Sequence, residues 1–173
     1  MNELHLTGIE RRFGDDEVIV SKTDTGGRIA YANRIFLRIA DLSERDTIGK
    51  PHNLIRHPHM PRSIFRLLWD TIGSGREMFA YILNRAAGGD HYWVLAHVTP
   101  SFDADGKVLG HHSNRRTADP RVIREIIAPL YKAMLEEERK HTRQKDGMEA
   151  GQALLTGMLK DKGLSYDRFI FSL

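Results

Sequence analysis

Two long runs of β-branched and aromatic residues constrain the fold more than any other feature of the chain. Residues 78–83 and 91–99 form these runs, and the Gly88-Gly-Asp90 turn between them favours a β-hairpin. A second turn, at residues 103–106, leads to a further strand that ends near Thr117. The sequence therefore predicts three consecutive antiparallel strands in this half of the chain.

The first half of the chain predicts one more hairpin followed by short helices. Two β-prone runs, residues 18–20 and 28–31, flank a Gly-rich turn. Asn33 is a good helix N-cap, and apolar residues recur at helical spacing in residues 35–39 and again in residues 64–72. We therefore expect two strands, a cluster of helices and then three strands.

Three prolines interrupt the helical region. Pro51, Pro58 and Pro61 each lack a backbone donor and disfavour a helical conformation in the residue before them. We therefore predict a compact loop over residues 51–61. Pro61 is also well placed for the first turn of the helix that follows.

Length and composition indicate one folded domain with an appendage. The chain has 173 residues, of which 40% are hydrophobic and 28% charged, and no run approaches the roughly 20 apolar residues of a spanning helix. The first residues do not combine a basic segment with an apolar core, so we expect a cytoplasmic protein without direct membrane insertion. The net charge of +3 comes from interleaved signs, so no nucleic-acid partner is expected.

The absence of cysteine removes several chemistries. Disulfides, thiolate metal sites, cysteine nucleophiles and cysteinyl-flavin photochemistry are all excluded. His91 and His97 share a strand face but lie some 20 Å apart at roughly 3.3 Å per residue, and the adjacent His111 and His112 point to opposite faces. We therefore expect no metal site. No nucleophile, base and oxyanion donor occur at recognisable spacing, so we expect no enzyme.

Helices are predicted for the residues that follow the last strand. Asp119-Pro120 is a helix-start signal, and Pro129 should kink or restart the apolar helix that follows. Residues 136–146 carry mixed charges and are expected to be solvated, and a further amphipathic stretch covers residues 148–159.

Several short motifs occur in order between about Val18 and Thr117: Gly49-Lys-Pro-His-Asn53, Arg56-His-Pro, Met60-Pro61, Phe65, Leu68-Trp69, Asn84-Arg85 and the Gly-Asp-His-Tyr-Trp-Val run that ends at Val94. This part of the chain resembles the flavin-binding PAS domain of bacterial aerotaxis receptors. The resemblance implies an α+β fold in which a five-stranded antiparallel sheet carries a cluster of short helices on one face. It also implies a pocket that holds FAD non-covalently, in a domain that signals the redox state of the FAD.

The resemblance suggests a division of the chain into three parts. Residues 1–16 are expected to form an N-terminal cap segment, residues 17–118 the PAS sensor domain, and residues 119–173 a helical extension for dimerisation or partner binding. No receptor-type signalling helix is evident in the sequence, so we expect the signal to pass to a separate protein partner or across a homodimer.

Four candidate cofactor-binding residues belong to the proline-rich loop. Arg56 and His57 offer a guanidinium and an imidazole to the pyrophosphate or the flavin ring; a surface loop with a local salt bridge is the alternative. His52 and Asn53 either donate to flavin carbonyls or cap the adjacent turn.

Four further candidates lie on the predicted helices and strands. Asn33 and Asn84 have amides that suit the edge of an isoalloxazine ring, although Asn33 also suits a capping role. Trp69 either stacks on the flavin or packs in the core. The family commonly has a Trp on the pocket-lining strand where this chain has Met78 or Phe79, which makes Phe79 a candidate for the pocket wall.

The sequence leaves two alternatives to a flavin sensor. Some PAS domains bind haem through a single axial histidine, so a haem-binding gas sensor has the same expected fold. The other alternative is a cofactor-free PAS module that only binds a partner protein.

Overall fold

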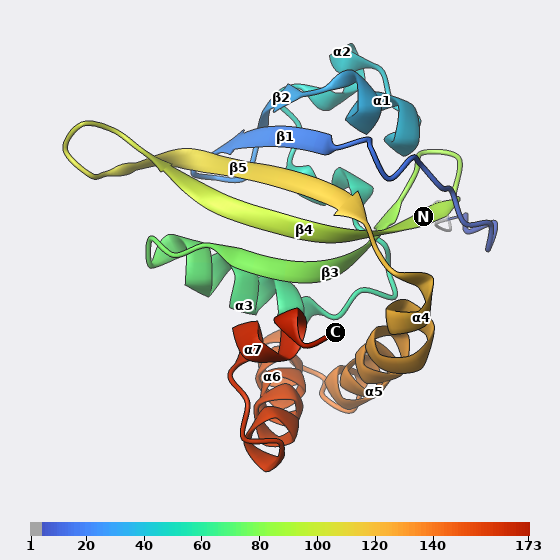
Figure 1. The fold of residues 1–173 in the computed structure, drawn as a ribbon, viewed down its shortest axis with the longest axis vertical. Helices are drawn as coiled ribbons and strands as arrows, with labels where there is room; N and C mark the ends of the chain where they lie inside the picture. Colours follow the sequence, from blue (N-terminus) through green and yellow to red (C-terminus); the bar gives the residue numbers. More distant parts are fainter. Residues whose placement is uncertain (1–4) are drawn as a thin grey trace.

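The computed structural model of the protein describes residues 5–173 and contains a five-stranded antiparallel sheet with strand order β2-β1-β5-β4-β3 (Figure 1). The strands are β1 (Ile19–Asp24), β2 (Ile29–Ala32), β3 (Met78–Arg85), β4 (His91–Phe102) and β5 (Val108–Thr117). Both predicted hairpins are present, and β5 pairs with β1 to join them. The predicted five-stranded antiparallel sheet is therefore confirmed.

Short helices cover one face of this sheet, which we call the inner face. They are α1 (Arg34–Ala40), α2 (Glu44–Thr47), the 3₁₀ turn η1 (His52–Ile55) and α3 (Arg62–Gly73). Side-chain oxygens of Asn33 and Ser43 cap α1 and α2 by accepting from backbone N–H groups three residues ahead. The predicted loop over residues 51–61 contains only the single turn η1, as its prolines require.

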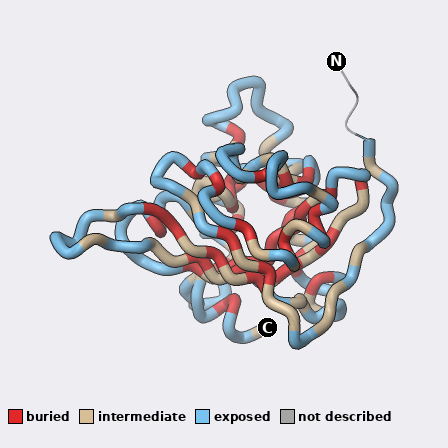
Figure 2. Tube along the Cα trace, turned by 90° about the horizontal axis from the view of Figure 1, so that it is seen from above, coloured by how far each residue is buried: buried red, intermediate tan, exposed pale blue. Residues whose placement is uncertain are grey.

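Alternation along the paired strands separates the two faces of the sheet. Phe79 pairs with His97, and the two rings stack on the opposite, outer face, whereas Ala80 pairs with Ala96 on the inner face. Buried residues concentrate along the middle of the strands, and the tip of the β4–β5 hairpin is exposed (Figure 2).

The C-terminal extension, residues 119–173, is a set of helices that we call the tail. It comprises α4 (Pro120–Val122), the π-helical segment η2 (Ile123–Ile127), α5 (Ala128–Arg139), α6 (Gln144–Asp161) and α7 (Tyr166–Phe171). The kink or restart expected at Pro129 takes the form of this π-helical segment, in which the Ala128 N–H bonds to the Ile123 carbonyl. This wider helical turn just before Pro129 leaves room for the proline ring, and it changes the hydrogen-bonding pattern where proline has no N–H to donate.

The tail packs on the outer face and on α3. Phe171 meets Phe79 edge-on, with ring centroids 4.8 Å apart, and Tyr131 lies 6.1 Å from Trp93. In Figure 1, α5, α6 and α7 lie together beside β3 and α3. The tail is thus part of the same packed body as the sheet.

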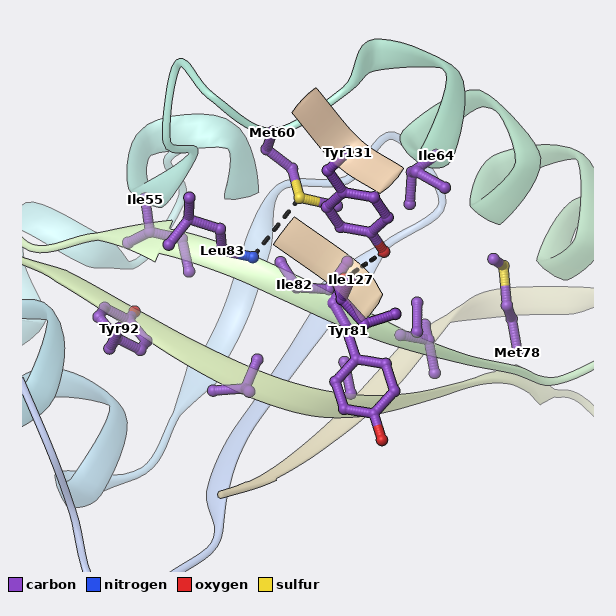
Figure 3. Packing of buried hydrophobic residues seen from close by; sticks show 14 of the residues in the cluster. Ile55, Met60, Ile64, Met78, Tyr81, Ile82, Leu83, Tyr92, Ile127 and Tyr131 are labelled. Atoms are coloured by element: carbon purple, nitrogen blue, oxygen red, sulfur yellow. Dashed lines mark hydrogen bonds between the residues drawn. The ribbon is translucent and has the colours of Figure 1, made fainter. Parts of the chain in front are cut away.

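Two side chains from other elements form hydrogen bonds with the backbone of the edge strand β3 (Figure 3). The Tyr131 hydroxyl donates to the Tyr81 carbonyl at 2.7 Å, and the Leu83 N–H donates to the Met60 sulfur at 3.5 Å. Both bonds satisfy backbone groups that an edge strand otherwise leaves open to pairing with another chain.

One residue of the charged segment 136–146 departs from the expected solvated position. The Glu138 carboxylate accepts from the Ser63 N–H at 2.8 Å, the Ser63 hydroxyl at 2.6 Å and the Arg62 N–H at 3.1 Å. These donors lie in the first turn of α3, where Pro61 supplies no side-chain cap. A carboxylate at a helix N-terminus is stabilised by the unpaired N–H groups and the helix dipole, so the expectation of solvation was wrong for Glu138.

Two glycines of α6 allow this contact to form. A Cβ at Gly147 would lie 2.6 Å from the Glu138 carbonyl oxygen, and a Cβ at Gly151 would lie 2.8 Å from the Ser63 hydroxyl. Only glycine therefore lets α6 approach α5 and α3 this closely.

The N-terminal segment runs beside the β3–β4 turn. The Arg11 N–H donates to the His91 carbonyl at 2.7 Å, and the Arg11 guanidinium pairs with Asp90 at 2.8 Å and with Asp41 at 3.4 Å. Residues 1–4 of the expected cap segment, residues 1–16, lie outside the described residues.

Candidate cofactor-binding site

A cavity of about 380 Å³ lies between the inner face of the sheet and the helices. This volume falls in the range of roughly 300–1,000 Å³ typical of small-molecule sites. Its lining residues come from β1, the β1–β2 turn, the proline-rich loop, α3 and strands β3 to β5: Ser21, Thr23, Gly26, Gly27, Pro51, His52, Asn53, Ile55, Arg56, Phe65, Leu68, Trp69, Ile72, Ile82, Asn84, Ala96, Val98, His111, Ser113 and Arg115.

Apolar side chains make up one wall of the cavity. Phe65, Leu68 and Ile72 project from α3 toward Ile82 and Val98 on the sheet. Such a wall suits the flat face of an aromatic ligand.

Trp69 stands at the rim of the cavity. It is 42% exposed, and its ring meets His111 edge-on at 5.3 Å. A Cβ at Gly27 would lie 3.0 Å from the indole ring, so the glycine makes room for it. Trp69 is therefore a boundary residue and does not belong to the buried core.

Arg115 is the central polar group of the cavity. It lies on β5, is 3% exposed, and donates through Nη2 to the Ser21 hydroxyl at 2.8 Å and to Nε2 of His52 at 2.6 Å. Burial, followed by the charge of Arg115, lowers the pKa of His52 to about 3. His52 is therefore neutral, and its Nε2 lone pair is the acceptor for Arg115.

Three buried donors in the cavity lack a protein partner. They are Nδ2 of Asn84, the Ser113 hydroxyl and Nη1 of Arg115. A buried donor left unsatisfied costs about 1–3 kcal/mol, so these groups favour a bound molecule that presents acceptors. No carboxylate lines the cavity among the described residues, which further favours an acceptor-rich or anionic ligand.

Arg56 provides a second guanidinium at the cavity wall. It lies over the Phe65 ring at 4.6 Å and donates to the Met60 carbonyl at 3.3 Å. Burial lowers the pKa of Arg56, and the nearby Arg62 lowers it further, whereas Glu138 opposes the shift. The side chain is thus held in place by an aromatic face and a backbone acceptor.

Five of the eight residues predicted from the sequence line the cavity: His52, Asn53, Arg56, Trp69 and Asn84. The other three are Asn33, His57 and Phe79, and each has another position.

All hydrogen bonds of the Asn33 side chain go to nearby backbone groups. Its side-chain oxygen accepts from the Val20 and Phe36 N–H groups, and its amide donates to the Val18 carbonyl at 2.8 Å. It therefore caps α1 and ties it to β1, so the capping alternative applies.

His57 points away from the cavity into a cluster of imidazoles. It is 5% exposed, its Nδ1 accepts from the His59 N–H at 3.1 Å, and its ring lies 5.0 Å from that of His59 and 6.0 Å from that of His91. Burial, followed by Coulombic repulsion from His59, His91 and Arg85, lowers the pKa of His57 to about 4.

Phe79 lies on the outer face of the sheet. It stacks on His97 at 4.1 Å and contacts Phe171 of the tail. Met78, one residue earlier, is the residue that points inward, and it is buried in the core. The expectation for Phe79 failed because a shift of one residue along a strand reverses the face.

Ser21, Ser113 and Arg115 were not predicted from the sequence as site residues, and the sequence left open which of His111 and His112 faces inward. Ser21 on β1 and His111, Ser113 and Arg115 on β5 all point into the cavity. Their period of two was visible in the sequence, but only the pairing of β5 between β1 and β4 shows that this face is buried.

The cavity, the strand order and the helical cluster together define a PAS domain. Residues 29–113 match the family model described as the PAS fold. The light-state structure of the blue-light photoreceptor Aureochrome1 LOV superposes with a TM-score of 0.55 at 18% identity, covering 70% of this chain and 92% of that one. The chain therefore has the PAS fold.

Two curated proteins are more similar in sequence. The chain is 37% identical over 130 residues to the aerotaxis receptor of Escherichia coli (strain K12), covering 75% of this chain and 25% of the receptor. It is 28% identical over 91 residues to the nitrogen fixation regulatory protein of Klebsiella pneumoniae, covering 53% of this chain and 18% of that protein. The chain thus spans about a quarter or less of the length of these relatives.

Two further features of the described residues bear on the site. None of the helices in this part of the chain is both long and apolar enough to cross a membrane. Within residues 5–173, no three His, Asp or Glu side chains lie close enough together to hold a metal ion.

Proposed function

We propose that the protein is a signalling module that holds a flavin, as FAD, in the cavity and responds to the redox state of that flavin. The observation that carries this proposal is the buried Arg115, which together with Asn84 and Ser113 presents unpartnered donors in a cavity without a carboxylate. The similarity to the aerotaxis receptor supports it. A Light-Oxygen-Voltage domain that was studied with a flavin analogue has a similar fold, at 16% identity and a TM-score of 0.54.

The residues of the cavity fit such a ligand. Phe65, Leu68 and Ile72 would pack on the flat ring, whereas the donors of Asn84, Ser113 and Arg115 would meet its carbonyl oxygens and ring nitrogens. A bound flavin supplies reversible uptake of electrons, which adds charge and a proton to the ring. Arg115 is the residue placed to stabilise added negative charge, because it is buried where solvent screening is weak.

A path from the cavity to the tail runs through β3. Asn84 lies on this edge strand, and the Tyr81 carbonyl, three residues away, accepts from Tyr131 of α5. A change in the hydrogen bonding of Asn84 would therefore shift a strand that the tail holds directly. We propose that the tail passes this change to a protein partner or across a homodimer in the cytoplasm, without catalysis by this chain.

An absorption spectrum of the purified protein tests the proposal. We expect the visible bands of an oxidised flavin and release of FAD on denaturation. Colourless protein that takes up no added flavin would overturn the proposal and leave a module that only binds partners.

The role of Arg115 can be tested by potentiometry. Arg115→Gln removes the buried charge, so we expect the flavin midpoint potential to fall by about 30 mV or more, since about 30 mV is a tenfold effect for a two-electron couple. Arg116→Gln is the matched control, because Arg116 is the next residue and is exposed. Equal potentials in both variants would contradict the role given to Arg115.

A haem-binding sensor is the second candidate because of His111. This residue is 8% exposed and lines the cavity, which is what a single axial ligand requires. A Soret band that disappears in His111→Ala would favour haem over the flavin.

A further inference from the structure

A second hollow adjoins the cavity on the side of the tail. This basin has a volume of about 670 Å³ and lies between the proline-rich loop, the start of α3 and the α5–α6 connection. Twelve residues line the basin, and seven of them belong to the tail, among them Glu138, Arg139 and His141. Asn53, Arg56 and Arg62 line it from the other side, so the basin exists only with the tail packed in this position.

The basin and the cavity share two wall residues, Asn53 and Arg56. The Arg56 guanidinium therefore borders both hollows. Its one hydrogen bond to protein goes to the Met60 carbonyl, which leaves most of its five N–H donors available to a ligand. A molecule that extends from one hollow to the other would pass this guanidinium.

The charge of the basin favours an anion. Arg62 and Arg139 add their positive charges to that of Arg56 around the basin, and Glu138 is the single carboxylate of the lining. Both oxygens of Glu138 are already used by donors from the first turn of α3. The remaining guanidinium groups are suited to bind phosphate oxygens in a bidentate manner.

We propose that the basin binds the diphosphate and adenosine end of the flavin nucleotide, so that the cofactor extends from the cavity past Arg56 into a site walled by the tail. This inference rests on the proposed function and makes it more specific. It assigns Arg139 and His141 of the tail to the cofactor site, and it makes FAD a better ligand than FMN or riboflavin. It also couples ligand binding to the docking of the tail, since the same molecule touches the PAS domain and the α5–α6 connection.

Binding of three flavins to the apo form of the full chain tests this inference. The affinities of riboflavin, FMN and FAD are measured by quenching of flavin fluorescence. We expect FAD to bind most tightly, and ADP to compete with FAD but not with riboflavin. Equal affinity for riboflavin and FAD would overturn the inference and leave the proposed function intact, whereas failure of every flavin to bind would remove both.

A double variant locates the effect in the tail. Arg139→Ala/His141→Ala should weaken FAD on the order of tenfold through lost charge-assisted contacts and leave riboflavin unchanged. Arg121→Ala/Lys160→Ala is the matched control, because both residues are exposed tail cations outside the basin. An unchanged FAD affinity in the first variant, or an equal loss in both, would contradict the assignment.

Discussion

The inner face of β3 and β4 borders an open cavity, whereas the outer face of the same strands is covered by side chains of the protein. On the inner face of β3 and β4, Ile82, Asn84 and Ala96 border a cavity of about 380 Å³. On the outer face, Phe79 stacks on His97 and Trp93 packs near Tyr131 of the tail. The outer face is therefore closed by large aromatic side chains of the protein, whereas small and polar residues keep the inner face open.

Because of this difference, residues on the outer face of a strand contribute mainly to stability, whereas residues on its inner face contribute mainly to ligand binding. On the outer face, aromatic side chains of the tail pack against β3 and β4, and the Tyr131 hydroxyl donates to the Tyr81 carbonyl. Closely packed side chains of this kind contribute mainly to stability. The inner face keeps buried donors without partners, which costs stability unless a ligand supplies acceptors. Mutations on the two faces should therefore have different readouts.

The largest expected effect comes from filling the cavity. Ala96→Phe places a ring on the inner face where Ala96 is 2% exposed, and we expect flavin affinity to fall on the order of 100-fold or more. Leu95→Phe is the control on the outer face and should retain the flavin. The measurement is flavin binding by fluorescence, and normal binding by Ala96→Phe would show that the cavity is not the flavin site.

Removal of the Glu138 carboxylate should be the next largest effect. Glu138→Ala leaves the first turn of α3 without its cap, and we expect the free energy of unfolding to fall by about 2–3 kcal/mol. Glu136→Ala removes only an exposed pair with Lys132 at 4.0 Å and should cost less than about 0.5 kcal/mol. Urea denaturation followed by circular dichroism gives both values, and equal losses would refute the capping role.

Acidification should destabilise the protein through His57. Its pKa is about 4 in the fold, against about 6.5 for an unfolded histidine, so the unfolded state binds more protons between these values. The stability contribution is therefore complete above pH 6.5 and is lost as the pH falls toward 4, which amounts to about 2 kcal/mol at pH 5.

The matched variant for this prediction is His57→Asn, whose amide oxygen can accept from the His59 N–H as Nδ1 of His57 does. We expect it to flatten the fall in melting temperature between pH 7 and pH 5. His5→Asn, at an exposed position of the N-terminal segment outside both hollows, should leave the fall unchanged. A wild-type slope in His57→Asn would contradict the assignment.

The smallest expected effect distinguishes two tyrosines of the tail whose hydroxyl groups are buried. Tyr131→Phe removes the bond to the Tyr81 carbonyl and should cost about 1 kcal/mol, because a buried acceptor is left unpaired. Tyr166→Phe removes a buried hydroxyl that has no partner, so it should be neutral or slightly stabilising. Chemical denaturation measures both, and equal costs would mean that the Tyr131 bond does not hold the edge of β3.

Much of the fold could be predicted from local patterns. The turn residues between β3 and β4, the cap at Asn33 and the prolines at positions 51 and 61 each act over a few residues, and the structure follows them closely. The expectation for residues 136–146 failed at Glu138 because its donors lie about 75 positions earlier in the chain. No local pattern reports such a pairing.

The candidate site was only partly predictable for the same reason. Arg56 and Asn84 belong to motifs that resemble a known family, whereas Arg115 belongs to none of them and became visible only in the register of β5 against β1. The face of Phe79 also depended on that strand geometry, because neighbouring residues of a strand point in opposite directions.

By itself, the sequence determined the order of strands and helices and the family resemblance, since turns, caps and alternation are properties of neighbouring residues. Only the tertiary structure decided which residues face the cavity, that Arg115 is its central charge, and that the tail contributes a wall to the adjoining basin. These features come from contacts between segments far apart in the chain. Their positions depend on how the sheet, the loop and the tail pack together.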